Sequence, residues 1–368
     1  MFNYPIRLER QDYYRKKGEA KMQPSNVLSL ILDEMDQSKT SIPHFKGWTR
    51  PKSCATAMKT HITGCLIHEK NLHLFIDLLQ WPHDPNLTIS CLVQAITSET
   101  DTLPKKLYIQ CDNCGRENKN RYVIGFLGYL CLAGYVKEAH LSFLIKGHTH
   151  EDIDQRFSKI SHRLRKVNAF TLPELEKEVE ESFLKKPHAS ILGCVWDIKE
   201  WLDKVLCDMS AHSYQHQFWM YCDRPHHVTL KYRRFSTDSW QPELNDDQLE
   251  LFDLDINGDH VLPRGVPKHV RPVFDVARFT GIRNAVTKLK PFLPFEQYNW
   301  WTEFLKNPEK AMQKNVRWPL LQLKKIHRIN IIDVHSTELP EPSCIDDMVT
   351  AEGVQREVVT KRRKRTVK

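Results

Sequence analysis

The sequence predicts an α/β protein with a mixed five-stranded sheet flanked by helices, followed by an α+β accessory region. Three observations predict it: short apolar runs typical of buried strands, amphipathic segments between the later runs, and acidic residues directly after two of the runs. The 368 residues are 40% hydrophobic and 27% charged, with 13 Gly and 20 Pro, which excludes collagen-like, coiled-coil and wholly disordered chains.

The first elements are a charged helical extension and three strands. Residues 5–22 have helix-like charge patterning, and the apolar run 27–32 ends at Asp33, as expected of a strand buried on both faces. Two more apolar runs, 60–67 and 72–79, are joined by a polar turn and predict a hairpin.

Helices and strands then alternate. A helix opens at Asp84-Pro85, with Pro at a favoured first position, and its apolar residues follow helical spacing. The elements expected after it are a strand at 107–111 ending at Asp112, a helix from 122, a strand at 141–145 and a helix at about 152–167.

The order strand, strand, strand, helix, strand, helix, strand, helix matches the ribonuclease H-like architecture. In that fold the first, fourth and fifth strands run parallel through helical crossovers, and the second and third form an antiparallel flank. Four regions are expected: an N-terminal helical extension at 1–23, a ribonuclease H-like core at 24–168, a mixed accessory region at 169–345 and a basic disordered tail at 346–368.

Within the accessory region, the sequence predicts two amphipathic helices at 172–184 and 191–207. Strands are expected within 218–235, and the aromatic residues around 298–304 mark another helix.

Three aspartates are the candidate catalytic and metal-binding residues. Asp33 ends the first strand, Asp112 ends the fourth, and Asp154 lies near the start of the last helix, on the stripe that should face the sheet. The carboxyl ends of parallel strands meet at one sheet edge, and the helix after the fifth strand begins there. Asp152, on the same helix, should point elsewhere.

Clustered carboxylates beside a core repel one another, and bound divalent cations remove that penalty. Oxygen ligands favour Mg²⁺ or Mn²⁺ over zinc. Two such ions can support in-line attack on a phosphodiester, which is the chemistry of nucleases and strand transfer.

The intervals from residue 33 to 112 and from 112 to 154 resemble those of acidic-triad (DDE/D) transposases and retroviral-type integrases. The segment HTHEDIDQRFSKI is similar to the helix start that carries the third acid in mariner-type transposases, which places Asp154 at that acid. More closely, LDEMDQSKTSIPHF, QCDNCGRENKN and GHTHEDIDQRFSKIS resemble an uncharacterised transposon-derived protein family of animals. The third acid is Asp where many relatives have Glu.

The resemblance implies a metal-dependent enzyme that cleaves or transfers phosphodiesters in DNA, with two Mg²⁺ or Mn²⁺ ions as cofactors. The alternative is a catalytically inactive, domesticated transposase that binds DNA or protein in the nucleus. No helix-turn-helix or zinc-finger module precedes Asp33 in this sequence, which favours a domesticated or truncated copy. The expected partner is DNA, with a homo-oligomer as a further candidate and no membrane.

A basic helix face is the candidate nucleic-acid contact. Its residues step by three and four positions beside the proposed site: Arg156, Lys159, Arg163 and Lys166. An ordinary solvated face is the alternative. Asp36, His148 and His150 are candidate accessory residues, although Asp36 also fits a loop hydrogen-bonding role.

Zinc is the competing metal. His148-x-His150-x-Asp152 resembles the ligand motif of metallo-β-lactamase-fold hydrolases, but that motif expects His where Ile153 stands. Cys111-x-x-Cys114 could join the two histidines in a Cys₂His₂ site, although a buried thiol at Cys111 is favoured.

The net charge of +8 is concentrated in the tail. Residues 354–368 hold seven Lys or Arg and one Glu, and the KRRKR run within them fits a nuclear-import signal or a phosphate-binding tail. The chain shows no signal peptide and no membrane span, and its ten scattered Cys indicate reduced thiols. A nuclear location is therefore expected.

Overall fold

The computed structural model describes residues 3–47, 57–143, 152–209, 213–242 and 249–326. The described residues belong to one compact unit, and residues 327–368 lie outside the described part of the chain. The basic tail, with its expected import signal, therefore also lies outside it, as do His148 and His150.

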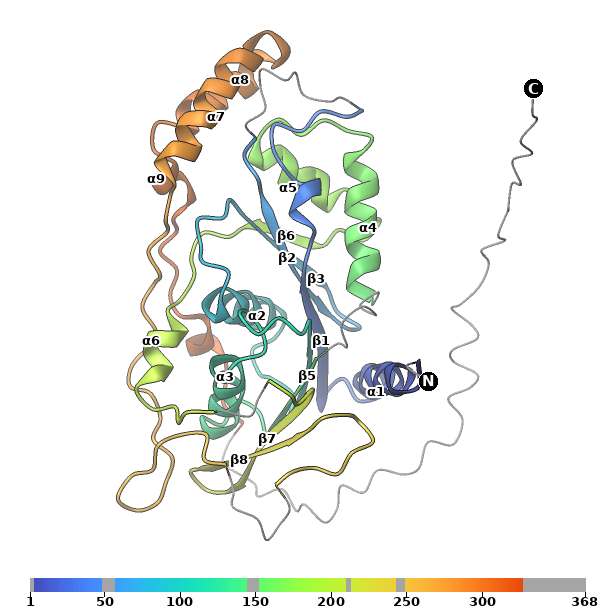
Figure 1. The fold of residues 1–368 in the computed structure, drawn as a ribbon, viewed down its shortest axis with the longest axis vertical. Coiled ribbons are helices and arrows are strands. Elements are labelled where there is room, and N and C mark those ends of the chain that lie inside the picture. Colours follow the sequence, from blue (N-terminus) through green and yellow to red (C-terminus); the bar gives the residue numbers. More distant parts are fainter. Residues whose placement is uncertain (1–2, 48–56, 144–151, 210–212, 243–248, 327–368) are drawn as a thin grey trace, which may run out of the picture. The chain divides into compact units, whose positions relative to one another are not determined.

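The strands form one mixed sheet flanked by helices (Figure 1). They are β1 (Val27–Glu34), β2 (His61–Ile67), β3 (Leu72–Asp77), β4 (Lys106–Cys111), β5 (Glu138–Phe143), β6 (His188–Ile191), β7 (Gln217–Arg224) and β8 (His227–Arg233).

The α-helices are α1 (Asn3–Met22), α2 (Pro85–Glu99), α3 (Arg121–Leu132), α4 (Asp152–Leu164), α5 (Leu172–Glu180), α6 (Ile198–Asp203), α7 (Val276–Leu289), α8 (Phe295–Phe304) and α9 (Pro308–Met312). Short 3-10 turns are η1 (Gln37–Lys39), η3 (Lys290–Phe292) and η4 (Pro319–Gln322).

The sheet order is β6-β3-β2-β1-β4-β5-β7-β8. β1, β4 and β5 pair in parallel and β1-β2-β3 pair antiparallel, so the predicted pairing of the first five strands is confirmed. The sheet is larger than predicted. β6 joins β3 at one edge, β7 and β8 extend the other edge, and the sheet therefore runs across the boundary expected at residue 168.

The two faces of the sheet bury separate cores. Leu30 and Leu32 of β1 pack in a core with residues of α2 and α3, whereas Ile31 packs with residues of α4 and α5. This split follows from the alternation of side chains along a strand. Figure 1 shows α2 and α3 on one side of the sheet and α1, α4 and α5 on the other.

Gly64 allows α4 to lie close to the sheet. It pairs with Asp33 across β1 and β2, and a Cβ atom at this position would lie 2.9 Å from the ring of Phe157 and 3.1 Å from Ile153. Both of these residues are buried on α4. The missing side chain therefore fixes the approach of the helix that carries Asp154.

The predicted helix 191–207 is wrong, and the helix predicted at 172–184 ends earlier, at Glu180. The observed elements are β6, which pairs in parallel with β3, and the short helix α6, whose N-cap Asp197 accepts a hydrogen bond from the backbone N–H of Glu200. Residues 188–191 form a strand because they pair with β3, which is distant in the sequence. The local pattern of apolar residues carries no information about that pairing. The strands expected within 218–235 and the helix expected at 298–304 are confirmed in type.

Candidate metal centre

The end of β1 sends consecutive acidic side chains to opposite faces of the sheet. Asp33 shares the face of Ile31, toward α4, and lies opposite Gly64 of β2. Glu34 shares the face of Leu32, toward α2, and lies opposite Thr63. Two groups of titratable side chains therefore lie on opposite faces at one end of the sheet.

Asp33 lies among other carboxylates. The pKa of Asp33 is raised to about 7, mainly because the side chain is largely buried. The Asp112 and Asp154 carboxylates raise this pKa further, whereas a 2.8 Å hydrogen bond from the backbone N–H of Glu34 lowers it. The three aspartates predicted from sequence are thus close enough to interact, from three separate elements. Among the described residues their oxygens do not form a group lying entirely within 4.8 Å, so the three are spaced more widely than ligands of a single ion.

Asp112 follows β4 directly and begins a loop that returns to the start of α2. Its Oδ1 accepts hydrogen bonds from the Asn118 side chain and, at 3.3 Å, from the backbone N–H of Cys114. Burial raises the pKa of Asp112, and the Glu34 carboxylate raises it further against these bonds. Asp112 therefore interacts with the acids on both faces.

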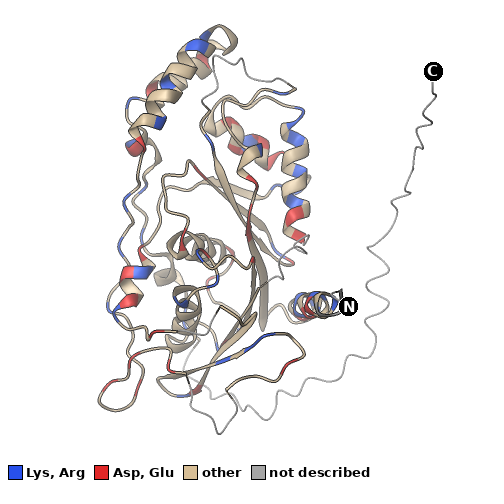
Figure 2. Ribbon diagram, in the orientation of Figure 1, with Lys and Arg blue, Asp and Glu red and all other residues tan. Residues whose placement is uncertain are grey.

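Asp154 occupies the first turn of α4, where Figure 2 shows acidic residues ahead of the basic residues along the helix. The stripe of Phe157, Ile160 and Leu164 is buried, as predicted, and Asp154 is half-buried beside it. Asp152 points elsewhere, as expected: its Oδ2 lies 2.7 Å from Nζ of Lys17 on α1.

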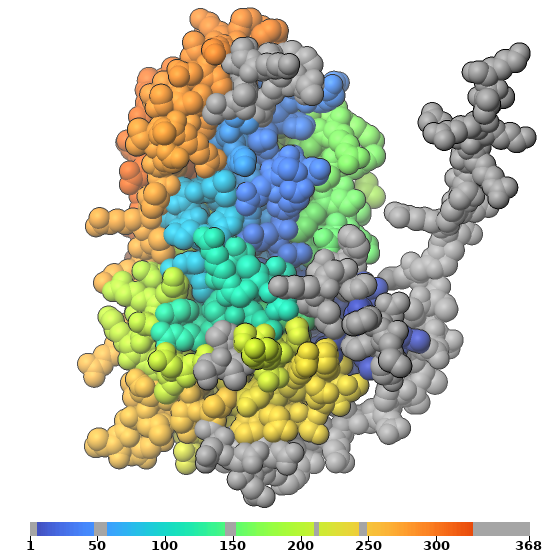
Figure 3. Space-filling model, in the orientation of Figure 1, coloured from blue at the N-terminus to red at the C-terminus, as the bar shows by residue number. Residues whose placement is uncertain are grey.

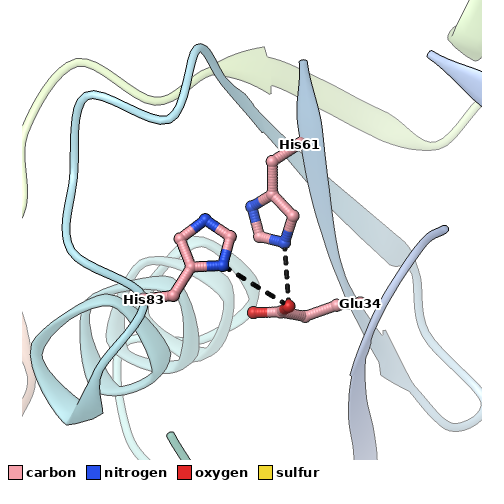
Figure 4. A group of neighbouring side chains, drawn as sticks. All are labelled: Glu34, His61 and His83. Atoms are coloured by element: carbon pink, nitrogen blue, oxygen red, sulfur yellow. Dashed lines mark ion pairs between the residues drawn. The ribbon is translucent and has the colours of Figure 1, made fainter. Parts of the chain in front are cut away.

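The second group was missed by the sequence analysis. Glu34, His61 and His83 offer ligand atoms that all lie within 4.8 Å of one another, and Figure 4 shows both imidazoles directed at the Glu34 carboxylate. Glu34 Oε2 is 3.0 Å from Nε2 of His61 and 3.8 Å from Nδ1 of His83. His61 is the first residue of β2, His83 precedes the N-cap of α2, and no short motif links them.

Two further carboxylates adjoin this group. Asp77 of β3 pairs with His61 across the hairpin, and its Oδ2 lies 2.7 Å from Nδ1 of that ring. Glu117, in the loop after Asp112, has Oε1 4.0 Å from Nδ1 of His83. The only sequence signals for these contacts were the adjacent acids at 33 and 34 and the polar starts of β2 and α2.

Electrostatics in this group follow from burial and from the charge of each neighbour. Burial opposes the charged form of His61, but its bond to Asp77 and the Glu34 carboxylate raise the pKa to about 10. Burial and the neighbouring charge of His61 lower the pKa of His83. Burial and the carboxylates of Glu34 and Asp112 raise the pKa of Glu117 to about 7.

The candidate basic face differs from the prediction. Arg163 is bound by two carboxylates of the following helix region, with Nε 2.7 Å from Glu178 and one Nη 2.9 Å from Glu181. Lys166 lies beyond the end of α4, so the predicted four-residue helix face is shorter than expected. Lys159 is exposed, with Nζ 5.8 Å from the centre of the Phe183 ring. Arg156 is half-buried on the same helix.

The remaining candidates have local roles. Asp36 caps the 3-10 turn η1, where it accepts hydrogen bonds from the backbone N–H and the hydroxyl of Ser38, and 65% of its side chain is exposed. Cys111 is buried in the core on the α2 side, as favoured for a plain thiol, and burial raises its pKa.

In the space-filling view the segment after β1 lies between the green α4 region and the turquoise residues after β4 (Figure 3).

The chain belongs to the family described as Domain of unknown function (DUF7869), whose model matches residues 50–238, just over half of the chain. The matched range contains Asp112, Asp154, His61, His83 and Glu117 and begins after Asp33. No curated protein and no solved structure matches the chain. Every helix in the described part of the chain is too short or too polar to cross a lipid bilayer.

Proposed function

We propose that the protein is a transposase-derived, DNA-acting enzyme with a ribonuclease H-like core, β3-β2-β1-β4-β5, and that Asp33, Asp112 and Asp154 form its catalytic site. The supporting observation is that these carboxylates come from a strand end, an adjacent strand end and the start of α4, and that Asp112 and Asp154 both add to the rise in the pKa of Asp33 that burial causes. The resemblance of the surrounding segments to acidic-triad transposases supports the same assignment.

The donor set fits Mg²⁺ or Mn²⁺. All three ligands are carboxylates. Among the described residues, Asp33 accepts a hydrogen bond from the backbone N–H of Glu34, and Asp112 accepts hydrogen bonds from the backbone N–H of Cys114 and the side-chain amide of Asn118. Such a cluster needs added positive charge when ionised. When bound, two ions would supply Lewis-acid activation of water or a 3′-hydroxyl and stabilise the leaving oxygen.

The roles of the chain's own residues follow from their positions. Asp33 interacts electrostatically with both of the other acids, and the three carboxylates together would hold the two ions. This assignment agrees with the wider spacing of the three carboxylates. The exposed Lys159 and the neighbouring Arg156 would contact the phosphate backbone of DNA near the site.

The test is nicking of supercoiled plasmid by the purified full chain with Mn²⁺. Asp112→Asn removes one charge without changing shape, and Asp36→Asn is the matched control because Asn also caps a turn and Asp36 is exposed. We expect cleavage by the unaltered chain and by Asp36→Asn, and none by Asp112→Asn. Equal cleavage by Asp112→Asn would contradict the assignment. Intact DNA binding without cleavage by the unaltered chain would favour the nuclear binding protein instead.

A further inference from the structure

The geometry points to a second metal site, a zinc site formed by Glu34, His61 and His83 with Glu117 as fourth ligand, on the α2 side of the sheet. This site is distinct from the proposed catalytic site, because its ligands include imidazoles and Glu34 lies on the opposite face of the sheet from Asp33, although Glu34 and Glu117 interact electrostatically with Asp112. The inference rests on the distances between ligand atoms, on the orientation of His61 and on the charge of the ligand set.

The distances suit a tetrahedral ion. Zinc bonds to histidine nitrogen and carboxylate oxygen at about 2.0–2.2 Å, which places two ligand atoms of a tetrahedron about 3.4 Å apart. The distances from Glu34 Oε2 to His61 Nε2 and to His83 Nδ1 are 3.0 and 3.8 Å, on either side of that value. Glu117 Oε1 is 4.0 Å from His83 Nδ1 but lies outside the group whose ligand atoms are all within 4.8 Å of one another, so its side chain would have to move to become the fourth ligand.

Both nitrogens of His61 face carboxylates, and a bound ion would replace the proton at Nε2, which points at Glu34. Nδ1 is 2.7 Å from the buried carboxylate of Asp77, whose other oxygen accepts the backbone N–H of Leu79. Nε2 of His61 is fully buried and has no hydrogen-bond partner of normal geometry, although it faces Glu34. A carboxylate that fixes one ring nitrogen and directs the other inward is the usual support of a histidine bound to zinc.

A second group of histidines differs because its ring nitrogens have hydrogen-bond partners. His227, Glu250 and His260 also lie within 4.8 Å, but Nδ1 of His260 accepts the backbone N–H of Val228. Its Nε2 therefore carries the proton, which it donates to Glu250 at 2.6 Å. Both nitrogens of His260 are used, so this group needs no ion.

The total charge of the four ligands and their chemical types indicate which metal ion the site would bind. Once the ion has displaced the second proton of His61, two neutral imidazoles and two carboxylates offset the charge of one divalent cation, which compensates for the partial burial of Glu34 and Glu117. Imidazole suits zinc and cobalt, whereas Mg²⁺ prefers oxygen ligands and keeps its waters. The site should therefore discriminate against the ions proposed for the aspartates.

The experiment uses Co²⁺ as a spectroscopic probe with the metal-stripped full chain. We expect one tightly bound Co²⁺ with the intense visible d–d absorption of a tetrahedral ion, no thiolate charge-transfer band, and displacement by Zn²⁺ but not by excess Mg²⁺. His83→Ala should weaken Co²⁺ binding by more than about 100-fold, since loss of a supporting residue alone costs 10- to 100-fold. Glu117→Gln should change the spectrum while keeping the other ligands.

Two controls separate this site from the rest of the chain. His162→Ala removes an exposed histidine of α4, and Asp154→Asn removes an acid of the proposed catalytic site, so both should bind Co²⁺ as the unaltered chain does. Unchanged Co²⁺ binding by folded His83→Ala would overturn the proposal. So would the absence of a tetrahedral spectrum in the folded, unaltered chain. A circular dichroism spectrum of each variant establishes folding.

Discussion

Asp33 and Glu34 are neighbours in the chain, yet their surroundings differ in the chemistry that matters for metals. On the α4 side, the charged groups that act on Asp33 among the described residues are carboxylates, which favour hard ions such as Mg²⁺ and Mn²⁺. On the α2 side, Glu34 meets two imidazoles and Glu117, which favour zinc. We propose that the alternation of side chains along this single strand places sites for two types of ion on the two faces of the sheet.

The largest expected effect is on the aspartate face. Asp154→Asn should reduce Mn²⁺-dependent plasmid cleavage by at least about 100-fold, because the charge stabilisation by a metal is worth several kcal/mol and each 1.36 kcal/mol is tenfold in rate. Rates of nicking measured by gel electrophoresis check this. Asp152→Asn is the matched control, since Asp152 faces Lys17 on α1 and should retain cleavage within a few-fold. Equal losses in both variants would indicate disruption of α4 instead.

The next effect is on the histidine face. Asp77→Asn should lower Co²⁺ affinity by about 10- to 100-fold, because the amide no longer fixes the Nδ1 proton of His61 in the same way. The tetrahedral spectrum should persist at saturating Co²⁺, and titration followed by absorbance measures the change. An unchanged Co²⁺ affinity would show that Asp77 does not support the metal site.

A smaller effect comes from the contact between α4 and the sheet. Gly64→Ala places a methyl group 2.9 Å from the Phe157 ring, so we expect a loss of about 1–3 kcal/mol in the free energy of unfolding. Movement of α4 should also reduce Mn²⁺-dependent cleavage while Co²⁺ binding is retained. Urea denaturation measures the first effect.

Gly18→Ala on α1 provides the control for Gly64→Ala. Apart from its chain neighbours and the backbone of its own helix, no described atom lies within 4 Å of a Cβ atom at Gly18, and Ala in a helix interior is favoured over Gly by about 0.5–1 kcal/mol. A loss of stability in Gly18→Ala equal to that in Gly64→Ala would contradict the steric explanation.

The smallest effect concerns DNA contact. Lys159→Ala should lower DNA affinity and reduce the salt-dependence slope by about one, because it removes one phosphate contact. Arg163→Ala should leave the slope unchanged, since Arg163 is bound to Glu178 and Glu181, and should change stability by about 1 kcal/mol or less. Fluorescence anisotropy over a range of salt concentrations measures the slopes. Equal changes in the two slopes would contradict the division between these residues.

The sequence predicted the central pairing of the sheet and the convergence of the aspartates because both depend on local signals. Apolar runs mark buried strands, and Asp33 and Asp112 follow two of them directly. Asp154 could be assigned to the sheet side because the apolar stripe of α4 repeats at helical spacing.

The histidine group could not be predicted because its members come from separate elements without a shared motif. His61 begins β2, His83 precedes α2, and Glu117 lies in a loop held to α2 by the Thr88 hydroxyl, which donates to the Glu117 carbonyl at 3.3 Å. Arg163 likewise looked available for DNA because its partners on and after α5 lie in another element. β6 depends on its pairing with β3 in the same way.

The most direct test of two ions on two faces is anomalous diffraction from crystals of the full chain soaked with Mn²⁺ and Zn²⁺ together. We expect a zinc peak among Glu34, His61, His83 and Glu117, and manganese peaks at the cluster of Asp33, Asp112 and Asp154. Both ions in one shared position, or zinc at the aspartates with nothing at the histidines, would contradict the assignment of two ion types to two faces.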